Sequence, residues 1–121
     1  MTLSECFDAI KVGNQAIKDT DVKLNFDTSI FIQNKNDCGT LVRYCQTEDE
    51  FLKYVRETAE DVKDDDPEFY VNILKKDCNF IFEDGKATIH YADPAIGKII
   101  TVELILHLTM QYNKDGLRIW L

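Results

Sequence analysis

The sequence predicts a single α+β domain spanning residues 1–121, in which an antiparallel meander sheet carries two amphipathic helices on one face. The sheet is expected to have three long C-terminal strands plus shorter ones. Three observations lead to this fold class. Apolar and polar residues alternate over most of residues 78–121, with turn signals between the runs. Two stretches in the first half space their apolar residues as helices do. A length of 121 residues suits one hydrophobic core rather than two.

The first half of the chain predicts two helices and two short strands. Residues 3–18 form an amphipathic run that begins at Ser4 as the N-cap, with Gly13 as a candidate C-terminal cap. Residues 29–33 and 40–45 are predicted strands that can pair as a hairpin. The second helix covers residues 47–62, because Thr47 and Glu50 form a capping box and Asp-Asp-Asp-Pro follows at 64–67.

The second half predicts two hairpins joined by a long strand. Asp84-Gly85 between β-branched and aromatic runs is typical of a type I′ turn, which places Phe80 opposite Ile89. Residues 99–112 alternate as one long strand. Pairing Ile89 with Ile100 keeps the apolar residues on one face, and Asn113-Lys114-Asp115-Gly116 then turns the chain into a last strand. The resulting apolar face, which the helices should cover, consists of Phe80, Phe82, Ile89, Tyr91, Ile100, Val102, Leu104, Leu106, Leu108, Met110, Ile119 and Leu121.

The opposite, outer face of the sheet is one candidate interaction surface. Aromatic, arginine and isoleucine side chains interrupt its polar residues, and such side chains are enriched in protein interfaces. A homodimer formed through this face and partial cover by the chain's own loops are both open alternatives. The predicted interface residues are Ile81, His90, Ile105, His107, Arg118 and Trp120.

Acidic residues provide a second candidate surface. The chain has a net charge of −8 and a pI near 4.6, with the excess concentrated in residues 48–68. Direct nucleic-acid binding is not expected, because phosphate contacts require Lys and Arg. The alternatives are a solvated helix face that keeps the protein soluble and a patch that docks on a basic protein surface. The predicted patch consists of Glu57, Glu60, Asp61, Asp64, Asp65, Asp66 and Glu68.

The sequence does not predict an enzyme, a cofactor or a metal site. Cys6, Cys38, Cys45 and Cys78 lack metal-ligand spacing, so we expect free thiols rather than a zinc site or a Cys38–Cys45 disulfide. No nucleophile elbow, phosphate-binding loop or buried carboxylate pair is present. No apolar run is long enough for a membrane span and no signal peptide is recognisable, which leads us to expect a cytoplasmic protein.

The order of the elements resembles a known superfamily. An N-terminal helix, a short strand region at 29–33, a capped helix at 47–62 and long strands ending in Asp115-Gly116-Leu117-Arg118-Ile119-Trp120 look like the nuclear-transport-factor-two-like, or SnoaL-like, proteins. This resemblance implies a cone-shaped α+β domain, often dimeric through the outer sheet face. It also implies a cavity between helices and sheet that enzymes of the superfamily line with Asp, His or Tyr.

Three functions follow as hypotheses. The preferred one is a non-catalytic acidic module, of the inhibitor or immunity-protein type, that binds and occludes a protein partner with a basic surface. The second is a small apolar-ligand binder, with a cavity between Phe51 and Val55 on the helix and Phe80, Tyr91 and Leu106 on the sheet. The third is a SnoaL-like lyase or isomerase that uses Tyr91 or Tyr112 as its acid.

Overall fold

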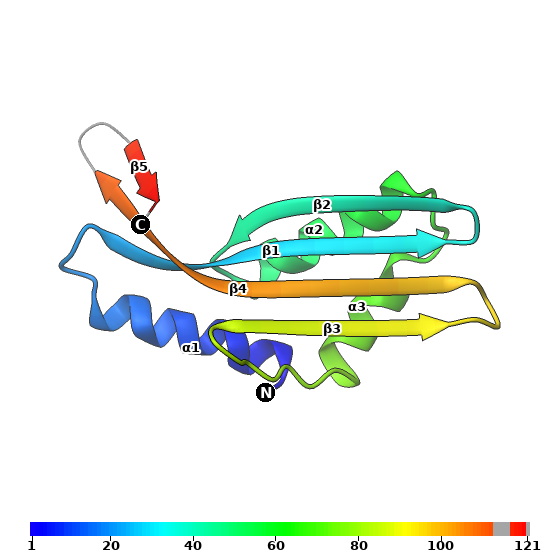
Figure 1. The fold of residues 1–121 in the computed structure, drawn as a ribbon, viewed down its shortest axis with the longest axis horizontal. Coiled ribbons are helices and arrows are strands. Elements are labelled where there is room, and N and C mark those ends of the chain that lie inside the picture. Colours follow the sequence, from blue (N-terminus) through cyan, green and yellow to red (C-terminus); the bar gives the residue numbers. More distant parts are fainter. Residues whose placement is uncertain (113–116, 121) are drawn as a thin grey trace.

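The chain folds as two layers, an antiparallel sheet and three helices on one side of it (Figure 1). The structure is a computed structural model that describes residues 1–112 and 117–120, and the side chains of residues 1–110. The elements in chain order are α1 (Leu3–Ala16), β1 (Val22–Asn34), β2 (Asp37–Cys45), α2 (Glu48–Asp61), α3 (Pro67–Lys76), β3 (Lys86–Asp93), β4 (Lys98–Tyr112) and β5 (Leu117–Trp120). The predicted α+β class with an antiparallel sheet is therefore confirmed.

The two longest strands lie side by side in the centre of the sheet. The strand order is β2-β1-β4-β3, and β5 pairs with the end of β4. β1 pairs with β4 from Val22–Met110 to Asn34–Lys98, so it is far longer than the short strand predicted at 29–33. The polar residues of β1 between positions 25 and 29 obscured it in the sequence, because they alternate with core residues such as Phe26 and Ile30.

The ends of the helices follow local chemistry. The capping box predicted for α2 is present, since Thr47 Oγ1 accepts from the N–H of Glu50 and the Glu50 carboxylate accepts from the N–H of Thr47. α1 begins with a second capping box, formed by Thr2 and Glu5, so the prediction of Ser4 as its N-cap was wrong.

Gly13 lies inside α1 rather than at its end. A Cβ atom added there would lie 2.5 Å from Leu24 Cδ1, so glycine lets the helix pack closely on β1. The side chain of Asn14 extends this contact, because it both donates to and accepts from the backbone of Leu24. The predicted role of Gly13 as a C-terminal cap is replaced by a packing role.

The strand predicted before the Asp84-Gly85 turn is absent. The turn itself is present, with positive φ at both residues and a single bridge between Glu83 and Lys86. Before this segment, residues 67–76 form α3, a helix that the sequence did not predict, whose first helical residue is Pro67. The following segment runs alongside Met1, and Phe80 is buried in the core. The alternation of aromatic residues that suggested a strand therefore serves core packing from an irregular segment.

The predicted register between β3 and β4 is shifted by two residues. Ile89 lies opposite Val102 rather than Ile100, which leaves every side chain on its predicted face because the strand period is two. Lys86 and Glu103 still form an ion pair of 3.0 Å, now diagonally across the two strands. The last hairpin has the predicted backbone pairs, Tyr112 with Leu117 and Met110 with Ile119.

The buried face of the sheet is shorter than predicted. Ile100, Val102 and Leu104 are fully buried, whereas Leu106 and Leu108 are 45% and 42% exposed. Of the described core residues, many come from the helices, including Leu74 and Val71 of α3, which the sequence did not predict.

Candidate protein-binding surfaces

Charge is distributed unequally between the two layers of the molecule. Residues 48–68, which include α2, the turn after it and the start of α3, contain ten acidic and three basic side chains. This segment therefore carries a net charge of −7 out of the −8 of the whole chain. The helix layer is where the acidity of this protein lies.

Most of the predicted acidic patch is exposed on α2, the turn and the start of α3. We call its accessible part the acidic surface, which consists of Glu57, Glu60, Asp61, Asp65, Asp66 and Glu68. Glu68 pairs with Arg56 at 2.6 Å, and Asp65 lies 3.8 Å from Lys98. In the part of the chain that the structure describes, no ion pair joins Glu57, Glu60 or Asp61 to a cation.

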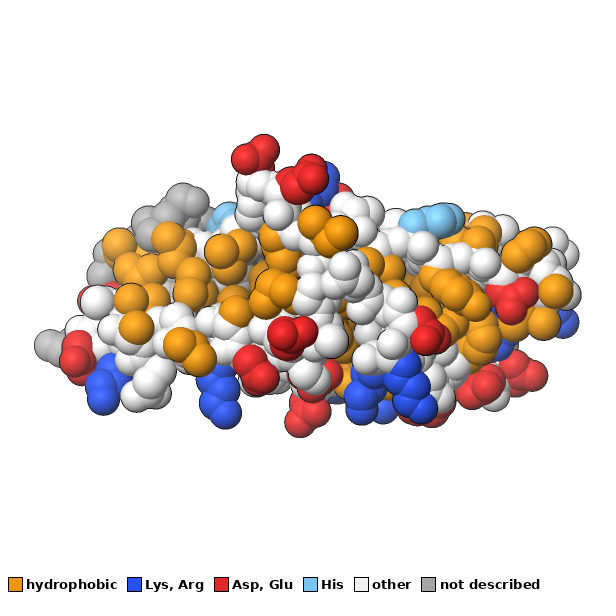
Figure 2. Space-filling model, turned by 90° about the horizontal axis from the view of Figure 1, so that it is seen from below, with side chains coloured by type: hydrophobic (Ala, Val, Ile, Leu, Met, Phe, Trp, Pro, Cys, Tyr) orange, Lys and Arg blue, Asp and Glu red, His pale blue; other side chains and the backbone are white. Residues whose placement is uncertain are grey.

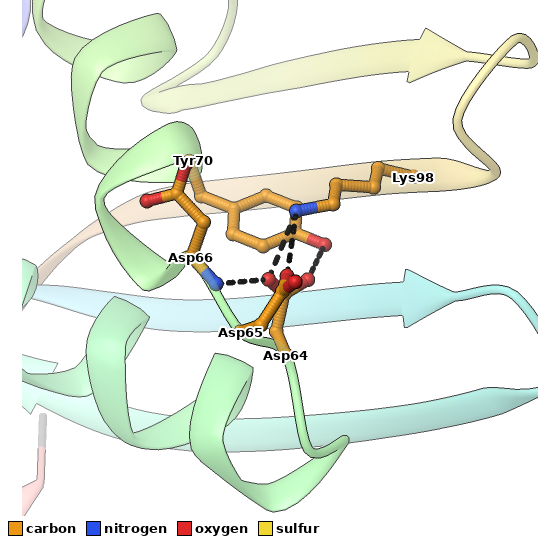
Figure 3. A network of polar contacts seen from close by, with 5 residues as sticks. All are labelled: Asp64, Asp65, Asp66, Tyr70 and Lys98. Atoms are coloured by element: carbon orange, nitrogen blue, oxygen red, sulfur yellow. Dashed lines mark hydrogen bonds and ion pairs between the residues drawn. The ribbon is translucent and has the colours of Figure 1, made fainter.

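Asp64 does not belong to this surface, although the sequence predicted it there. Its side chain is fully buried, and its carboxylate is the centre of a polar network (Figure 3). Oδ2 accepts from the Tyr70 hydroxyl at 2.6 Å. Oδ1 accepts from Lys98 Nζ at 2.9 Å and from the N–H of Asp66 at 2.8 Å. These bonds offset the cost of burying a charge, so Asp64 joins the turn between α2 and α3 to β4.

The electrostatics of this network favour the ionised carboxylate. Burial alone would raise the pKa of Asp64, but the hydrogen bonds from Tyr70, the Asp66 N–H and Lys98 outweigh it and lower the pKa. Burial and the neighbouring carboxylate raise the pKa of Tyr70, which therefore stays protonated. Lys98 also lies 4.9 Å from the centre of the Phe69 ring, where the aromatic face favours a cation.

One feature of the sequence, the position of Lys98 in β4, indicates this network. Lys98 continues the even-numbered series of Ile100 and Val102, whose side chains face the helices. A lysine at an inward position of an alternating strand requires a buried anion or a route to solvent. Its anion, Asp64, comes from a turn 34 residues earlier in the chain, and the strand pattern gives no indication of that distance.

The outer face of the sheet is nearly free of charge. In β1 (residues 25–33) and β4 (residues 99–109), the odd-numbered residues lie on this face. In β2 and β3, the even-numbered residues do. Only Asp27, Lys86 and Glu103 carry charge among these residues, and Lys86 pairs with Glu103. None of the helices covers this face (Figure 1).

The predicted interface residues fall into three groups. His90, Ile105 and His107 lie on the outer face, where the His90 ring is 2.9 Å from the Thr101 hydroxyl and the His107 ring contacts Tyr44. Ile81 is 66% exposed but belongs to the irregular segment before β3, next to Lys86 and Thr88. The side chains of Arg118 and Trp120 lie outside the described residues.

The described residues contain no cluster of His, Cys, Asp and Glu that could hold a metal ion. All four cysteines are free thiols, as predicted. Burial raises the pKa of Cys6 and of Cys45 to about 11, so both thiols are protonated at neutral pH. Cys38 and Cys45 lie at opposite ends of β2, a separation that excludes the disulfide weighed between them.

The residues expected to line a cavity between the second helix and the sheet belong to the hydrophobic core cluster. Phe51 and Val55 are fully buried in the core. An apolar groove of about 260 Å³ lies instead between α1 and the sheet. Its lining consists of Met1, Cys6, Ala9, Ile10, Leu24, Phe26, Phe82, Gly85 and Leu106. Figure 2 looks at the molecule from the α1 and β3 side and shows apolar side chains gathered between charged ones.

Comparison of the chain with protein-family models, with curated proteins and with solved structures finds no match. The resemblance to nuclear-transport-factor-two-like proteins therefore stays a prediction. None of the helices in the described part of the chain has the length and apolar character that a membrane crossing requires.

Proposed function

We propose that this protein is a non-catalytic binding module whose acidic surface docks on a basic surface of a protein partner. The observation that supports this proposal best is the segregation of charge. Residues 48–68 hold a net charge of −7, while the described side chains of the outer sheet face at residues 25–33 and 99–109 and at the even positions of β2 and β3 include three charged ones. A concentrated field of one sign speeds association with an oppositely charged surface and selects among partners.

The buried network below the acidic surface supports the same proposal. Asp64, Tyr70 and Lys98 fix the turn between α2 and α3, and the side chain of the adjacent Asp65 is 95% exposed. A surface that is ordered before binding loses less conformational entropy when it binds. By covering a basic surface, such a module would block the access of other anionic molecules to it, which is the action of an inhibitor or immunity-type protein.

The proposal is tested with two charge-reversed variants that change the net charge equally. Glu60→Lys with Asp61→Lys alters the acidic surface, and Asp19→Lys with Asp21→Lys alters exposed residues between α1 and β1. Each protein is used to capture partners from lysate of the native host at low and high salt. We expect the wild type and the second variant to retain one stoichiometric partner at low salt, and the first variant to lose it. Equal capture by both variants would contradict the proposal.

The apolar groove favours a second candidate function, binding of a small apolar ligand. All of its lining side chains are apolar apart from the Cys6 thiol, and an apolar cavity of about 150 Å³ is already large enough for benzene. We expect decanoate to raise the melting temperature, because a ligand that binds only the folded state stabilises it. Ala9→Trp, which fills the groove, should remove this shift, whereas Ala16→Trp at the end of α1 should retain it.

We also propose that two copies of the chain associate as a homodimer through the outer sheet face. Its low charge would let two molecules of net charge −8 approach with little repulsion. Sedimentation of the purified protein tests this, with Thr101→Glu at the centre of the face expected to yield monomers. A monomeric wild type at high concentration would argue against this mode of assembly.

A further inference from the structure

The edge of the sheet at β2 carries backbone groups that no other strand of the described residues pairs with. Within the described residues, β2 is the outermost strand at this side and has β1 as its one neighbour (Figure 1). The N–H of Lys35 donates to the Gly97 carbonyl on the β4 side, so odd-numbered residues of β1 bond toward β4 and even-numbered ones toward β2. By the observed register, Cys38, Thr40 and Val42 of β2 therefore point their backbone N–H and C=O groups away from the sheet.

One of these groups already has a polar contact. The Arg43 guanidinium donates to the Val42 carbonyl at 2.8 Å, as expected if that carbonyl is not bonded to β1. Both residues are exposed neighbours in the chain, so the Arg43 side chain can be displaced when a backbone N–H of an added strand donates to the Val42 carbonyl. The edge therefore presents hydrogen-bonding groups in the regular spacing of a strand.

Apart from the charged side chains of Asp37 and Arg43, β2 lacks the features that usually protect an edge strand. It pairs with β1 over all nine of its residues without a bulge, and its sequence contains neither Lys nor Pro. Val42 is 55% exposed and Tyr44 is 37% exposed, and both side chains lie on the outer face of the sheet. A strand added to this edge would meet apolar neighbours on its outer side.

On the other side of the same edge lie acidic residues of α2. A Cβ atom on Gly39 would lie 3.9 Å from Asp61 Cβ and 3.2 Å from Val62 Cγ1, so this part of α2 packs directly on β2. Glu57 is one helical turn before Asp61 and shares its side of the helix. A strand added to β2 would therefore have the carboxylates of α2, together with the Arg43 guanidinium of β2, beside its helix-facing side chains.

We propose that the partner contacts this edge with an extended segment that adds to the sheet as a strand next to β2. The segment has apolar side chains on one face, beside Val42 and Tyr44, and Lys or Arg on the other, beside Glu57 and Asp61. Backbone hydrogen bonds supply affinity in such strand addition, and the alternating side chains supply specificity. This inference rests on the proposed function, because it names the form in which the basic partner binds.

A second copy of this chain fits the edge less well. Two β2 strands paired across a two-fold axis would bring the Glu57 and Asp61 pairs of both copies toward one another, and like charges repel. The opposite edge is also less suitable. At β3, the N–H and the C=O of Lys86 are already bonded to Glu83, and the outer side chains there are Lys86, Thr88, His90 and Ala92.

The test uses synthetic ten-residue peptides and amide hydrogen exchange measured by NMR. The probe alternates Lys and Val. One control has the same composition with the residues in blocks of two, and a second alternates Glu and Val. Of the three peptides, we expect the Lys-Val peptide to bind and the two controls not to bind. Its binding should slow hydrogen exchange of the Thr40 and Val42 amides at least tenfold. Binding without protection at these amides would overturn strand addition but leave the acidic surface as the binding site.

Two proline variants distinguish the edges. Val42→Pro removes an N–H that points away from the sheet, so no bond with β1 is lost, and Thr88→Pro does the same at β3. We expect Val42→Pro to lower the affinity for the Lys-Val peptide at least tenfold and Thr88→Pro to leave this affinity unchanged. Equal affinities would overturn the inference.

A charge variant provides the same test without proline. Glu57→Lys with Asp61→Lys should reverse the preference, so that the Glu-Val peptide now binds and the Lys-Val peptide does not. An unchanged preference would overturn the pairing of the basic face with α2. Dimerisation of the protein alone, with the Thr40 and Val42 amides protected, would identify a second copy as the occupant and overturn the inference as well. Retention of the native partner by Val42→Pro would leave the proposed function standing while removing strand addition.

Discussion

Asp64 and Asp65 are neighbours with identical side chains, but the structure treats them in opposite ways. Asp64 is fully buried and bonded to Tyr70 and Lys98, whereas the Asp65 side chain is 95% exposed and lies 3.8 Å from the same lysine. A buried carboxylate is tolerated only with partners that compensate for lost water, and an exposed one needs none. The difference shows that consecutive acidic residues in a sequence can have separate roles, one stabilising the fold and the next exposed on the surface.

The largest effect should come from removing the cation of the buried network. Lys98→Met leaves the Asp64 carboxylate buried without its charge partner, a change that typically costs about 3 to 5 kcal/mol of stability. Chemical denaturation measures this loss. Asp64→Asn combined with Lys98→Met should recover part of it, because the unpaired charge is then gone. If Lys98→Met is as stable as the wild type, the carboxylate of Asp64 does not depend on Lys98, and the contrast with the exposed Asp65 is wrong.

A smaller effect is expected for Tyr70→Phe. The ring remains in the core, but the carboxylate of Asp64 loses one hydrogen bond of 2.6 Å, and bonds to charged groups contribute about 1.5 to 3 kcal/mol. Lys98 and the Asp66 N–H still bind the carboxylate, so the loss should be below that of Lys98→Met. Thermal unfolding of both variants in one buffer would rank their stabilities. If Tyr70→Phe were the less stable of the two, the Tyr70 hydroxyl rather than Lys98 would contribute most to stabilising the buried carboxylate.

Acid should separate the two aspartates as well. The pKa of Asp64 is lowered from its ordinary value of 3.8, so its contribution to stability is complete above that pH and is lost as the pH falls through the lowered pKa. Stability measured between pH 5 and pH 2 should therefore decline less steeply in Asp64→Asn than in the wild type. Asp65→Asn serves as the control and should follow the wild-type curve.

The smallest effect on stability is expected at the acidic surface. Glu60 and Asp61 are exposed at the end of α2, where lysine suits the helix dipole, so Glu60→Lys with Asp61→Lys should leave the free energy of unfolding, measured by chemical denaturation, within about 0.5 kcal/mol of the wild type. The same variant is the one expected to lose the partner. A large loss of stability would mean that these residues, like Asp64, serve the fold.

Local signals in the sequence were sufficient for the elements that depend on a few neighbouring residues. The Thr47–Glu50 capping box and the Asp84-Gly85 turn are formed by groups within three residues of one another, and both are present as predicted. The faces of β3 and β4 were also predicted, because an alternation of period two survives even a two-residue shift of register. The free state of all four cysteines followed from their spacing.

Other features depended on contacts between distant parts of the chain. Phe80 and Phe82 were predicted in a strand but lie in an irregular segment, where Phe80 is buried in the core and the partly buried Phe82 stacks on Phe26. α3 was not predicted, because acids and a proline at its start resemble the end of a preceding helix. The edge at β2 was also missed, since the order of strands in a sheet cannot be read from the strands themselves.

By itself, the sequence determined the α+β class, the sides of β3 and β4 that face the core, and the concentration of negative charge in residues 48–68. These properties follow from periodicity, capping and composition, which act over a few residues. Only the tertiary structure decided that Asp64 is buried against Lys98, that β1 and β4 form the centre of the sheet, and that β2 is an open edge beside Glu57 and Asp61. The physical reason is that burial and pairing depend on which distant segments meet, and that is settled by the packing of the whole core.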